Sequence, residues 1–220
     1  MLGASVGKER ARLLDLGAGV GTAGLVALTH NPRLCAVLAE QHPDMLALAA
    51  ANARDNGLAE RTSFVAVDVA AKGALRHAAG LADNAHDVVI ANPPFFEQGA
   101  GTLAGDSARA EARHMNAAAL DLWVKTAAGC AAGGGEVIFI FPAGSLSPLL
   151  GSFSQRFGAI SVLPLHSRPA QPASRVLIRG VKGSRAPMNL LPGRVLHEAE
   201  GRAFRPEFDA IFRGTAQLDW

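Results

Sequence analysis

Tyrosine is absent from this chain of 220 residues, and cysteine and tryptophan each occur only twice. The two cysteines, Cys35 and Cys130, lie far apart, each among apolar neighbours. Such a pair is neither a disulfide framework nor a set of metal ligands, which excludes a small disulfide-stabilised secreted scaffold. Reduced thiols in the core of a cytoplasmic protein fit the pattern.

Segments that target a chain to a membrane are also missing. The N-terminus shows no basic stretch followed by an apolar one, which is the pattern of a secretory signal. Residues 137–155 carry no charged side chain, but Pro142 and Pro148 interrupt the run, together with glycines and serines. These breaks exclude a membrane-spanning helix. We therefore expect a soluble, cytoplasmic protein.

Acidic residues are lacking between Glu136 and Glu198. The net charge of the whole chain is only +2, whereas this interval alone has seven basic residues and no acidic one. Positive charge is therefore concentrated here. Two interpretations stay open, a solvated basic face or a surface that binds a polyanion such as RNA. The basic residues of the interval are Arg156, Arg168, Arg175, Arg179, Lys182, Arg185 and Arg194.

Apolar residues are plentiful, at 49% of the chain, and they fall into short continuous runs between helical patterns. Continuous rather than alternating apolarity is typical of strands buried on both faces, as in a parallel sheet. The sequence predicts strands at 12–17, 34–40, 62–68, 87–93 and 136–142, and helices at 21–30, 43–56, 72–80, 115–131 and 146–157.

Two further strands are predicted at 159–165 and 174–182. The residues between them are too few for a crossover helix, so these strands should pair antiparallel. We expect one α/β domain over residues 1–220, with a doubly wound, mostly parallel, seven-stranded sheet and a C-terminal antiparallel hairpin. This order is the Rossmann-like pattern of class I methyltransferases rather than that of dinucleotide-dependent dehydrogenases.

The first predicted strand runs into the glycine-rich turn "GAGVG", in which Gly17, Ala18, Gly19 and Gly21 bring the backbone close to a ligand at a helix start. Read from Gly19, the spacing also matches the nicotinamide-cofactor fingerprint. That fingerprint should begin where the strand ends, at Gly17, and there its sixth position is Thr22 instead of glycine. The turn alone does not identify the cofactor.

Three acids at successive predicted strand ends favour S-adenosyl-L-methionine. Asp15 precedes the turn, where it would repel a pyrophosphate and attract an ammonium group. Glu40 is placed to accept both ribose hydroxyls, and Asp68 to accept from the adenine amino group. One such acid alone is as easily a solvated loop residue or a helix cap, but three beside a glycine turn form a cofactor site.

The fourth predicted strand ends in Asn92-Pro93-Pro94-Phe95, which resembles the N-P-P-[YF] motif of methyltransferases that act on amino and amide nitrogens. Proline stops a strand and stiffens the residues after it, so a plain strand terminator is the alternative. In the catalytic interpretation, the Asn92 side chain and the Pro93 carbonyl accept the two N–H bonds of the target nitrogen. Phe95 would stack on a flat substrate, and Asn92 also borders the cofactor site.

The chain from about residue 12 to 213 resembles the bacterial tRNA1(Val) (adenine-N6)-methyltransferase family. The resemblance rests on "DLGAGVGTAGL", "NPPFF", the long loop 97–115 and the tail 174–198. It implies methyl transfer to N6 of a tRNA adenine, with no metal, and makes residues 1–11 the end of a longer N-terminal segment and 190–220 a C-terminal tail. Candidate substrate-binding residues are Phe96, Arg109, Arg113 and His114 after the motif, and His166, Arg168 and Arg175 around the hairpin.

Other functions remain open at this point. The same motif occurs in methyltransferases of protein glutamine side chains and of small molecules. A catalytically weakened RNA-binding scaffold is a further alternative. Metal-dependent methylation of catechol-type hydroxyls is not expected, because the acid cluster that such enzymes need is not visible in the sequence.

Overall fold

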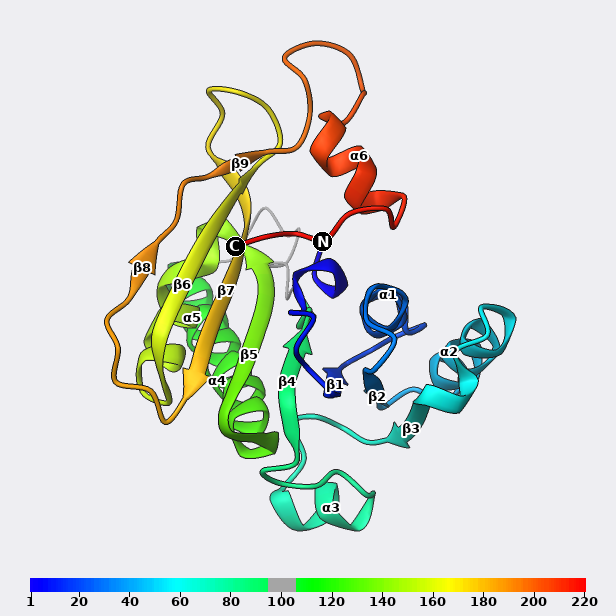
Figure 1. Ribbon diagram of the computed structural model, residues 1–220. Coiled ribbons are helices and arrows are strands. Elements are labelled where there is room, and N and C mark those ends of the chain that lie inside the picture. The colour runs from blue at the N-terminus through cyan, green and yellow to red at the C-terminus, as the bar shows by residue number, and fades with distance from the viewer. Residues whose placement is uncertain (95–105) are drawn as a thin grey trace.

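The protein is known from a computed structural model that describes residues 1–94 and 106–220, with the side chains of 106–116 left out (Figure 1). Its strands are β1 (Arg12–Leu16), β2 (Cys35–Glu40), β3 (Thr62–Ala66), β4 (His86–Ala91), β5 (Ala131–Pro142), β6 (Phe157–His166), β7 (Ala173–Lys182), β8 (Asn189–Leu190) and β9 (Arg194–Val195). Its α-helices are α1 (Thr22–His30), α2 (Pro43–Asp55), α3 (Gly73–Ala78), α4 (Asp106–Cys130), α5 (Leu146–Ser154) and α6 (Pro206–Phe212).

All the strands belong to one sheet, ordered β3-β2-β1-β4-β5-β7-β6-β8, with β9 also paired to β6. The pairs among β1 to β5 are parallel, whereas β7 runs antiparallel to both β5 and β6. The predicted α/β sheet and its C-terminal hairpin are confirmed. The strand order reverses between β1 and β4, the position at which open α/β sheets bind ligands beyond the carboxyl ends of their strands.

The C-terminal tail adds two strands to the seven predicted ones. β8 and β9 have two residues each and pair in parallel with β6, so the tail runs along the outer edge of the hairpin (Figure 1). Runs this short show no periodicity in a sequence, so only their tertiary pairing reveals them. Helix α6 was also not predicted. It begins with Pro206, whose fixed φ suits a first helical turn, and carries Glu207 and Asp209 near its positive N-terminal end.

Helix α4 begins at Asp106, well before the predicted start at 115. The prediction that residues 97–115 form one long loop is therefore wrong for 106–115. This part of the sequence has three alanines, two arginines and a glutamate, which all favour helix, but it lacks a clear apolar stripe. Helix propensity, rather than hydrophobic periodicity, was the signal to use here.

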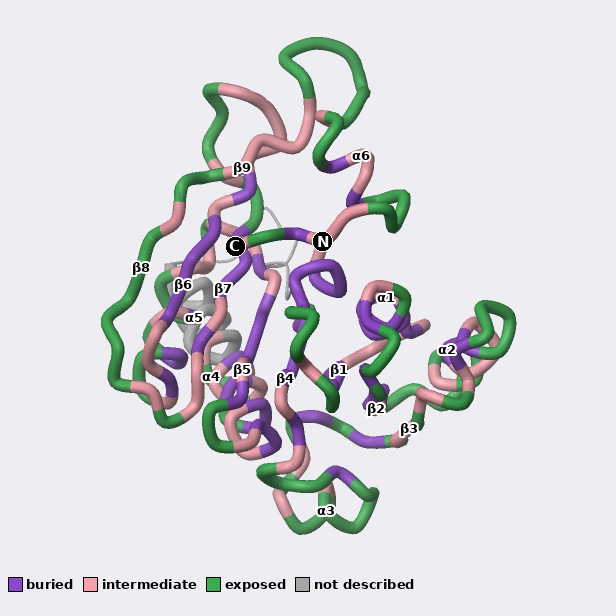
Figure 2. The backbone as a smooth tube through the Cα atoms, viewed as in Figure 1, coloured by how far each residue is buried: buried purple, intermediate pink, exposed green. Residues whose placement is uncertain are grey.

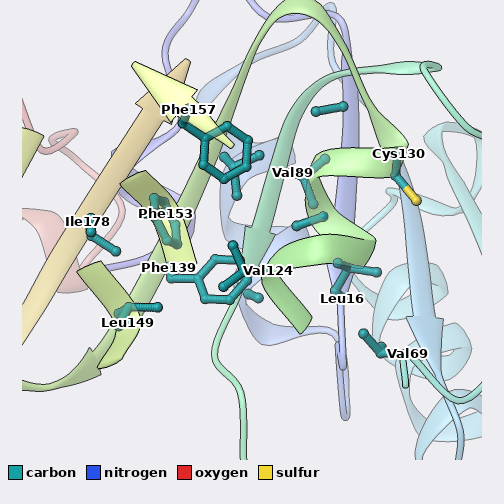
Figure 3. Close-up of a cluster of buried hydrophobic side chains, with 14 of the residues drawn as sticks. Leu16, Val69, Val89, Val124, Cys130, Phe139, Leu149, Phe153, Phe157 and Ile178 are labelled. Carbon is teal, nitrogen blue, oxygen red and sulfur yellow. The ribbon is translucent and has the colours of Figure 1, made fainter. Parts of the chain in front are cut away.

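Helices cover both faces of the sheet, which explains why the strands are continuously apolar. Neighbouring residues of a strand point to opposite faces, so Leu13 joins one core and Leu14 the other. One core lies under α4 and α5 and contains Phe139 and Phe153 (Figure 3). Their rings pack edge to face, with the ring centroids 5.4 Å apart. The other core lies under α1, α2 and α6 and contains Phe208. Buried backbone follows the central strands, while α3 and the tail loops are exposed (Figure 2).

The two ends of the chain lie side by side (Figure 1). The Leu218 N–H donates to the Ala4 carbonyl at 2.9 Å, and the Trp220 indole N–H donates to the Ser5 carbonyl at 3.3 Å. The Arg179 guanidinium lies over the Trp220 ring, 4.7 Å from its centroid. None of the described helices has both the length and the apolar composition that a bilayer-crossing segment needs.

Candidate active site

The glycine turn after β1 is fixed to the end of β2. The N–H groups of Gly17 and Ala18 both donate to the Ala39 carbonyl, at 2.8 and 3.0 Å. Gly17, Gly19 and Gly21 all have positive φ, between 56° and 85°, a conformation that side chains other than glycine rarely adopt. Helix α1 starts directly after Gly21. The four predicted turn residues therefore form one rigid backbone loop at the carboxyl edge of the sheet.

Trp123 of α4 closes one side of this turn. A Cβ atom placed on Gly17 would lie only 2.5 Å from Cη2 of the Trp123 indole. A Cβ atom on Gly19 would meet nothing within 4 Å, so the space beside Gly19 is open to a ligand. The two glycines thus have different tasks, one in packing against an aromatic ring and one in leaving room.

This difference predicts unequal costs for two similar substitutions. Both Gly17→Ala and Gly19→Ala force alanine into a left-handed conformation, at about 1–2 kcal/mol each. Gly17→Ala must also displace the Trp123 indole, which adds about 1–3 kcal/mol. We expect the free energy of unfolding, measured by urea denaturation, to fall further in Gly17→Ala than in Gly19→Ala. Equal losses would show that the indole yields without cost.

Asp15 is buried, with 2% of its surface exposed, and its Oδ2 accepts the Gly24 N–H of α1 at 2.8 Å. Burial raises the pKa of Asp15 to about 7, opposed by the Gly24 hydrogen bond and assisted by the nearby charge of Glu40. The carboxylate therefore holds the start of α1 in place. Its predicted contact with an ammonium group stays a prediction.

Glu40 connects the glycine turn to the start of α2. Its Oε2 accepts the Gly19 N–H at 3.0 Å and its Oε1 accepts the His42 N–H at 3.0 Å. Only 7% of the residue is exposed. Each carboxylate oxygen has a second lone pair, so two oriented acceptor sites remain for hydroxyl groups.

Asp68 follows β3 and is exposed, in contrast to the other two acids. Its Oδ1 accepts the Ala70 N–H at 2.8 Å. The Thr126 hydroxyl of α4 donates to the Val69 carbonyl at 2.9 Å and fixes this loop against the helix. The structure thus brings all three predicted acids to the carboxyl edge of the sheet: Asp15 within the last two residues of β1, Glu40 at the end of β2 and Asp68 after β3.

Asn92 follows β4 directly. Leu16 and Ala91 are paired in neighbouring parallel strands, so Gly17 and Asn92, the next residues along, leave the sheet side by side. Asn92 and Pro94 are exposed and Pro93 is buried. Phe95 and Phe96 lie outside the described residues. The predicted catalytic asparagine therefore adjoins the predicted cofactor turn.

The predicted substrate-binding residues fall into different situations. Arg109, Arg113 and His114 belong to α4 instead of a loop, and their side chains lie outside the described part of the chain. The His166 ring pairs through Nδ1 with the Gln171 carbonyl at 2.7 Å. The Arg168 guanidinium donates to the carbonyls of Glu198, Ala199 and Gly201 and so organises the tail. A role of these side chains in substrate binding stays a prediction.

Acids from other elements pair with three of the seven basic residues of the acid-free interval. Arg156 pairs with Asp121 of α4 at 2.7 Å, and Arg194 pairs with Glu207 of α6 at 2.9 Å. Lys182 donates to the Asn84 side chain and to a carbonyl, and Arg179 lies 4.0 Å from Glu136. Arg175 and Arg185 are exposed, and within the described residues neither makes an ion pair or a side-chain hydrogen bond. The sequence could not show these partners, because they lie 13 to 98 residues away along the chain and no local pattern connects them.

Two contributors to the site were missed at the sequence level. Trp123 carries no local signal, since an aromatic residue on an amphipathic helix is ordinarily a core residue. His42 contributes only its backbone N–H, which any residue except proline has. Across residues 1–94 and 117–220, no group of three histidine, cysteine, aspartate or glutamate side chains lies close enough together to hold a metal ion.

Comparison with known proteins identifies the family. The model of the methyltransferase small domain family matches residues 2–125 of this chain. A tRNA1(Val) (adenine(37)-N6)-methyltransferase of Shewanella frigidimarina is 32% identical over 113 residues, which cover 49% of this chain and 42% of that protein. The protein of the same name from Haemophilus influenzae is 26% identical over 136 residues, covering 61% and 55%. The matched regions thus span about half the length of these curated relatives.

One solved structure is similar over nearly the whole chain. It is the crystal structure of a "predicted O-methyltransferase" from Agrobacterium tumefaciens, with a TM-score of 0.83 and 27% identity. The match covers 99% of this chain and 96% of the other. The hairpin and tail therefore recur together with the parallel sheet in that relative.

Proposed function

Because this chain belongs to the methyltransferase small domain family, we propose that it methylates an exocyclic amino nitrogen, N6 of an adenine in tRNA. The methyl donor is S-adenosyl-L-methionine. The observation that carries the proposal is the position of Asn92 and Pro93, at the end of β4 and beside the glycine turn. Asparagine followed by two prolines at this edge of the sheet suits the orientation of a nitrogen nucleophile.

The described residues fit the methyl donor. The space beside Gly19 admits a ligand, and Glu40 presents oriented carboxylate oxygens next to it for the ribose hydroxyls. We assign Asp68, which is exposed, to the adenine amino group. The negative charge of Asp15 favours the ammonium and sulfonium groups of the donor. When bound, the donor supplies an electrophilic methyl group on a sulfonium.

The catalytic task of the protein is to prepare a poor nucleophile. The lone pair of an adenine amino nitrogen is delocalised into the ring. In our proposal, the Asn92 side-chain oxygen and the Pro93 carbonyl each accept one N–H bond, which draws the nitrogen toward tetrahedral geometry. The lone pair then faces the methyl carbon, the new N–C bond forms as the C–S bond breaks, and the nitrogen afterwards loses a proton. Phe95 stacks on the base.

The choice of tRNA rests on the names of the two curated relatives and on exposed positive charge. Arg175 and Arg185 lie on the hairpin and tail with no acidic partner among the described residues. The proposed modification of tRNA implies a cytoplasmic location. Protein glutamine side chains and small molecules are the alternative acceptors within the same nitrogen chemistry.

Transfer to a hydroxyl oxygen is a second candidate function. The relative from Agrobacterium tumefaciens, which matches nearly the full chain, is described as a predicted O-methyltransferase. Hydroxyl methylation needs a base to remove the hydroxyl proton, whereas the amino reaction needs acceptors that orient two N–H bonds. The carboxamide of Asn92 is the second kind of group.

The test is methyl transfer from labelled S-adenosylmethionine to unmodified tRNA. After digestion to nucleosides, we expect the label in N6-methyladenosine, and only background label with Asn92→Ala as the matched control. Label in 2′-O-methylated nucleosides would favour the second candidate. If tRNA takes up no label while S-adenosylhomocysteine still binds, tRNA is not the acceptor.

A further inference from the structure

A groove lies between α4 and the segment that leads from β3 into α3. Its volume is about 380 Å³, within the range of small-ligand sites. It begins two residues after Asp68, and the Thr126 hydrogen bond to Val69 holds its walls together. The groove is lined by Ala70, Ala71, Lys72, Gly73, Arg76, Leu122, Lys125 and Thr126.

Three of the lining residues are basic and none is acidic. Lys72 and Lys125 are exposed, and within the described residues neither has an ion-pair partner. Arg76 donates to the Ala71 carbonyl, which fixes its position while other guanidinium N–H groups remain for a ligand. Lys72 comes from one wall of the groove and Lys125 from the other, so a lysine flanks the groove on each side.

Each of the three acids near the groove has a hydrogen-bond partner. Asp121, one helical turn before Lys125, forms two hydrogen bonds with Arg156, and the charge of Lys125 acts on it as well. Asp83 pairs with His77 at 2.9 Å, and Asp68 accepts from the Ala70 backbone. Within the described residues no acid forms an ion pair with Lys72 or Lys125, so both ammonium groups can still meet an anion.

The surfaces between the basic groups are small and apolar. Ala70, Ala71 and Gly73 form one side, and the exposed Leu122 forms part of the other. A free phosphate would use the cations but leave this surface uncovered. A sugar-phosphate unit would contact both the basic side chains and the apolar surface, because its sugar carbons cover the apolar surface while its phosphate faces the cations.

We propose that this groove binds the sugar and phosphate of a second nucleotide of the RNA substrate, apart from the nucleotide that is methylated. The inference rests on the proposed function. The groove follows Asp68 at the carboxyl edge of the sheet, the edge that also carries Asn92, with the ends of β2 and β1 between them. In this proposal the RNA strand runs along that edge from Asn92 to Lys72 and Lys125. The contacts are to the backbone and hold the RNA in register without reading its sequence.

The test measures tRNA affinity at increasing salt concentrations for two double variants, each of which has lost two positive charges. We expect Lys72→Gln with Lys125→Gln to flatten the plot of log affinity against log salt by about 0.7–0.9 for each phosphate that the two lysines neutralise. Arg33→Gln with Arg54→Gln is the matched control, because both arginines are exposed and lie in the α1–β2 loop and on α2. The control pair should keep the wild-type slope, and all variants should bind S-adenosylhomocysteine as the wild type does.

The outcomes separate this site from the function on which it rests. If the wild type binds and methylates tRNA but the Lys72 and Lys125 variant keeps its slope, the groove does not bind RNA and the proposed function stands. If the wild type neither binds nor methylates tRNA, both proposals fail. Binding of adenosine monophosphate that the two lysine substitutions abolish, with the tRNA slope unchanged, would overturn the RNA site in favour of a free nucleotide.

Discussion

Replacing Asn92 with alanine is expected to lower kcat by about 10²-fold or more. The Asn92 contact matters most when the target nitrogen becomes tetrahedral, so its loss should be felt in turnover more than in tRNA affinity. Asn92 is exposed and follows the last residue of β4, so the variant should fold with wild-type stability. The measurement is the initial rate of methyl transfer under saturating S-adenosylmethionine and tRNA.

Asn92→Asp gives a second comparison at the same position. It keeps an acceptor but adds a charge that must be desolvated when substrate binds, so turnover should fall here too. Wild-type turnover in Asn92→Ala, with unchanged binding of S-adenosylhomocysteine, would make the two prolines a simple strand terminator. The catalytic assignment of Asn92 would then be wrong.

Asp15→Asn is expected to make the free protein more stable above about pH 7 and to weaken cofactor binding. Burial raises the pKa of Asp15 from 3.8 to about 7, so the folded chain carries a penalty when this carboxyl ionises. That shift corresponds to a penalty on the order of 4 kcal/mol. Asparagine removes the charge, and its side-chain oxygen can still accept the Gly24 N–H.

The sign of the pH dependence follows from the direction of the shift. Between about pH 4 and pH 7 the folded chain binds more protons at Asp15 than the unfolded chain, so stability falls as pH rises through this window. The stability advantage of Asp15→Asn should therefore be absent below about pH 4 and complete above about pH 7. Urea denaturation over this range measures it, and an advantage that does not change with pH would contradict the assignment.

The same substitution tests the proposed role of Asp15 in the cofactor site. Loss of its charge should weaken S-adenosylhomocysteine binding by about 1–3 kcal/mol in calorimetry. A variant that is more stable yet binds less tightly would show that the buried charge is kept for function at the expense of stability. Unchanged binding would confine Asp15 to holding the start of α1.

The sequence predicted those features of the fold that show as a pattern of apolar residues or that follow from the length of a connecting segment. Continuous apolar runs such as 136–142 gave the parallel strands, and the short connection after His166 required the antiparallel hairpin. The start of α4 was missed because residues 106–114 show helix propensity without an apolar stripe. Strands β8 and β9 exist only through their pairing with β6, for which two residues carry no local pattern.

The features of the site also divide into those that a local sequence pattern predicts and those that it does not. Backbone-driven features such as the glycine turn, and acids at strand ends such as Glu40, were predictable because strand topology alone collects them at one edge. Charge partners were not. Arg168 looked like a substrate contact, but the structure gives it three carbonyls of the tail, and no local pattern connects residue 168 with residues 198–201.

The packing of Trp123 against Gly17 gives the protein a built-in optical probe. The chain has only two tryptophans, and Trp220 lies on the opposite side of the sheet, against Arg179. In a Trp220→Phe background, the emission of the molecule comes from the one indole that touches the glycine turn. A ligand that enters beside Gly19 changes the surroundings of that indole, so occupancy of the turn can be followed by fluorescence without a label.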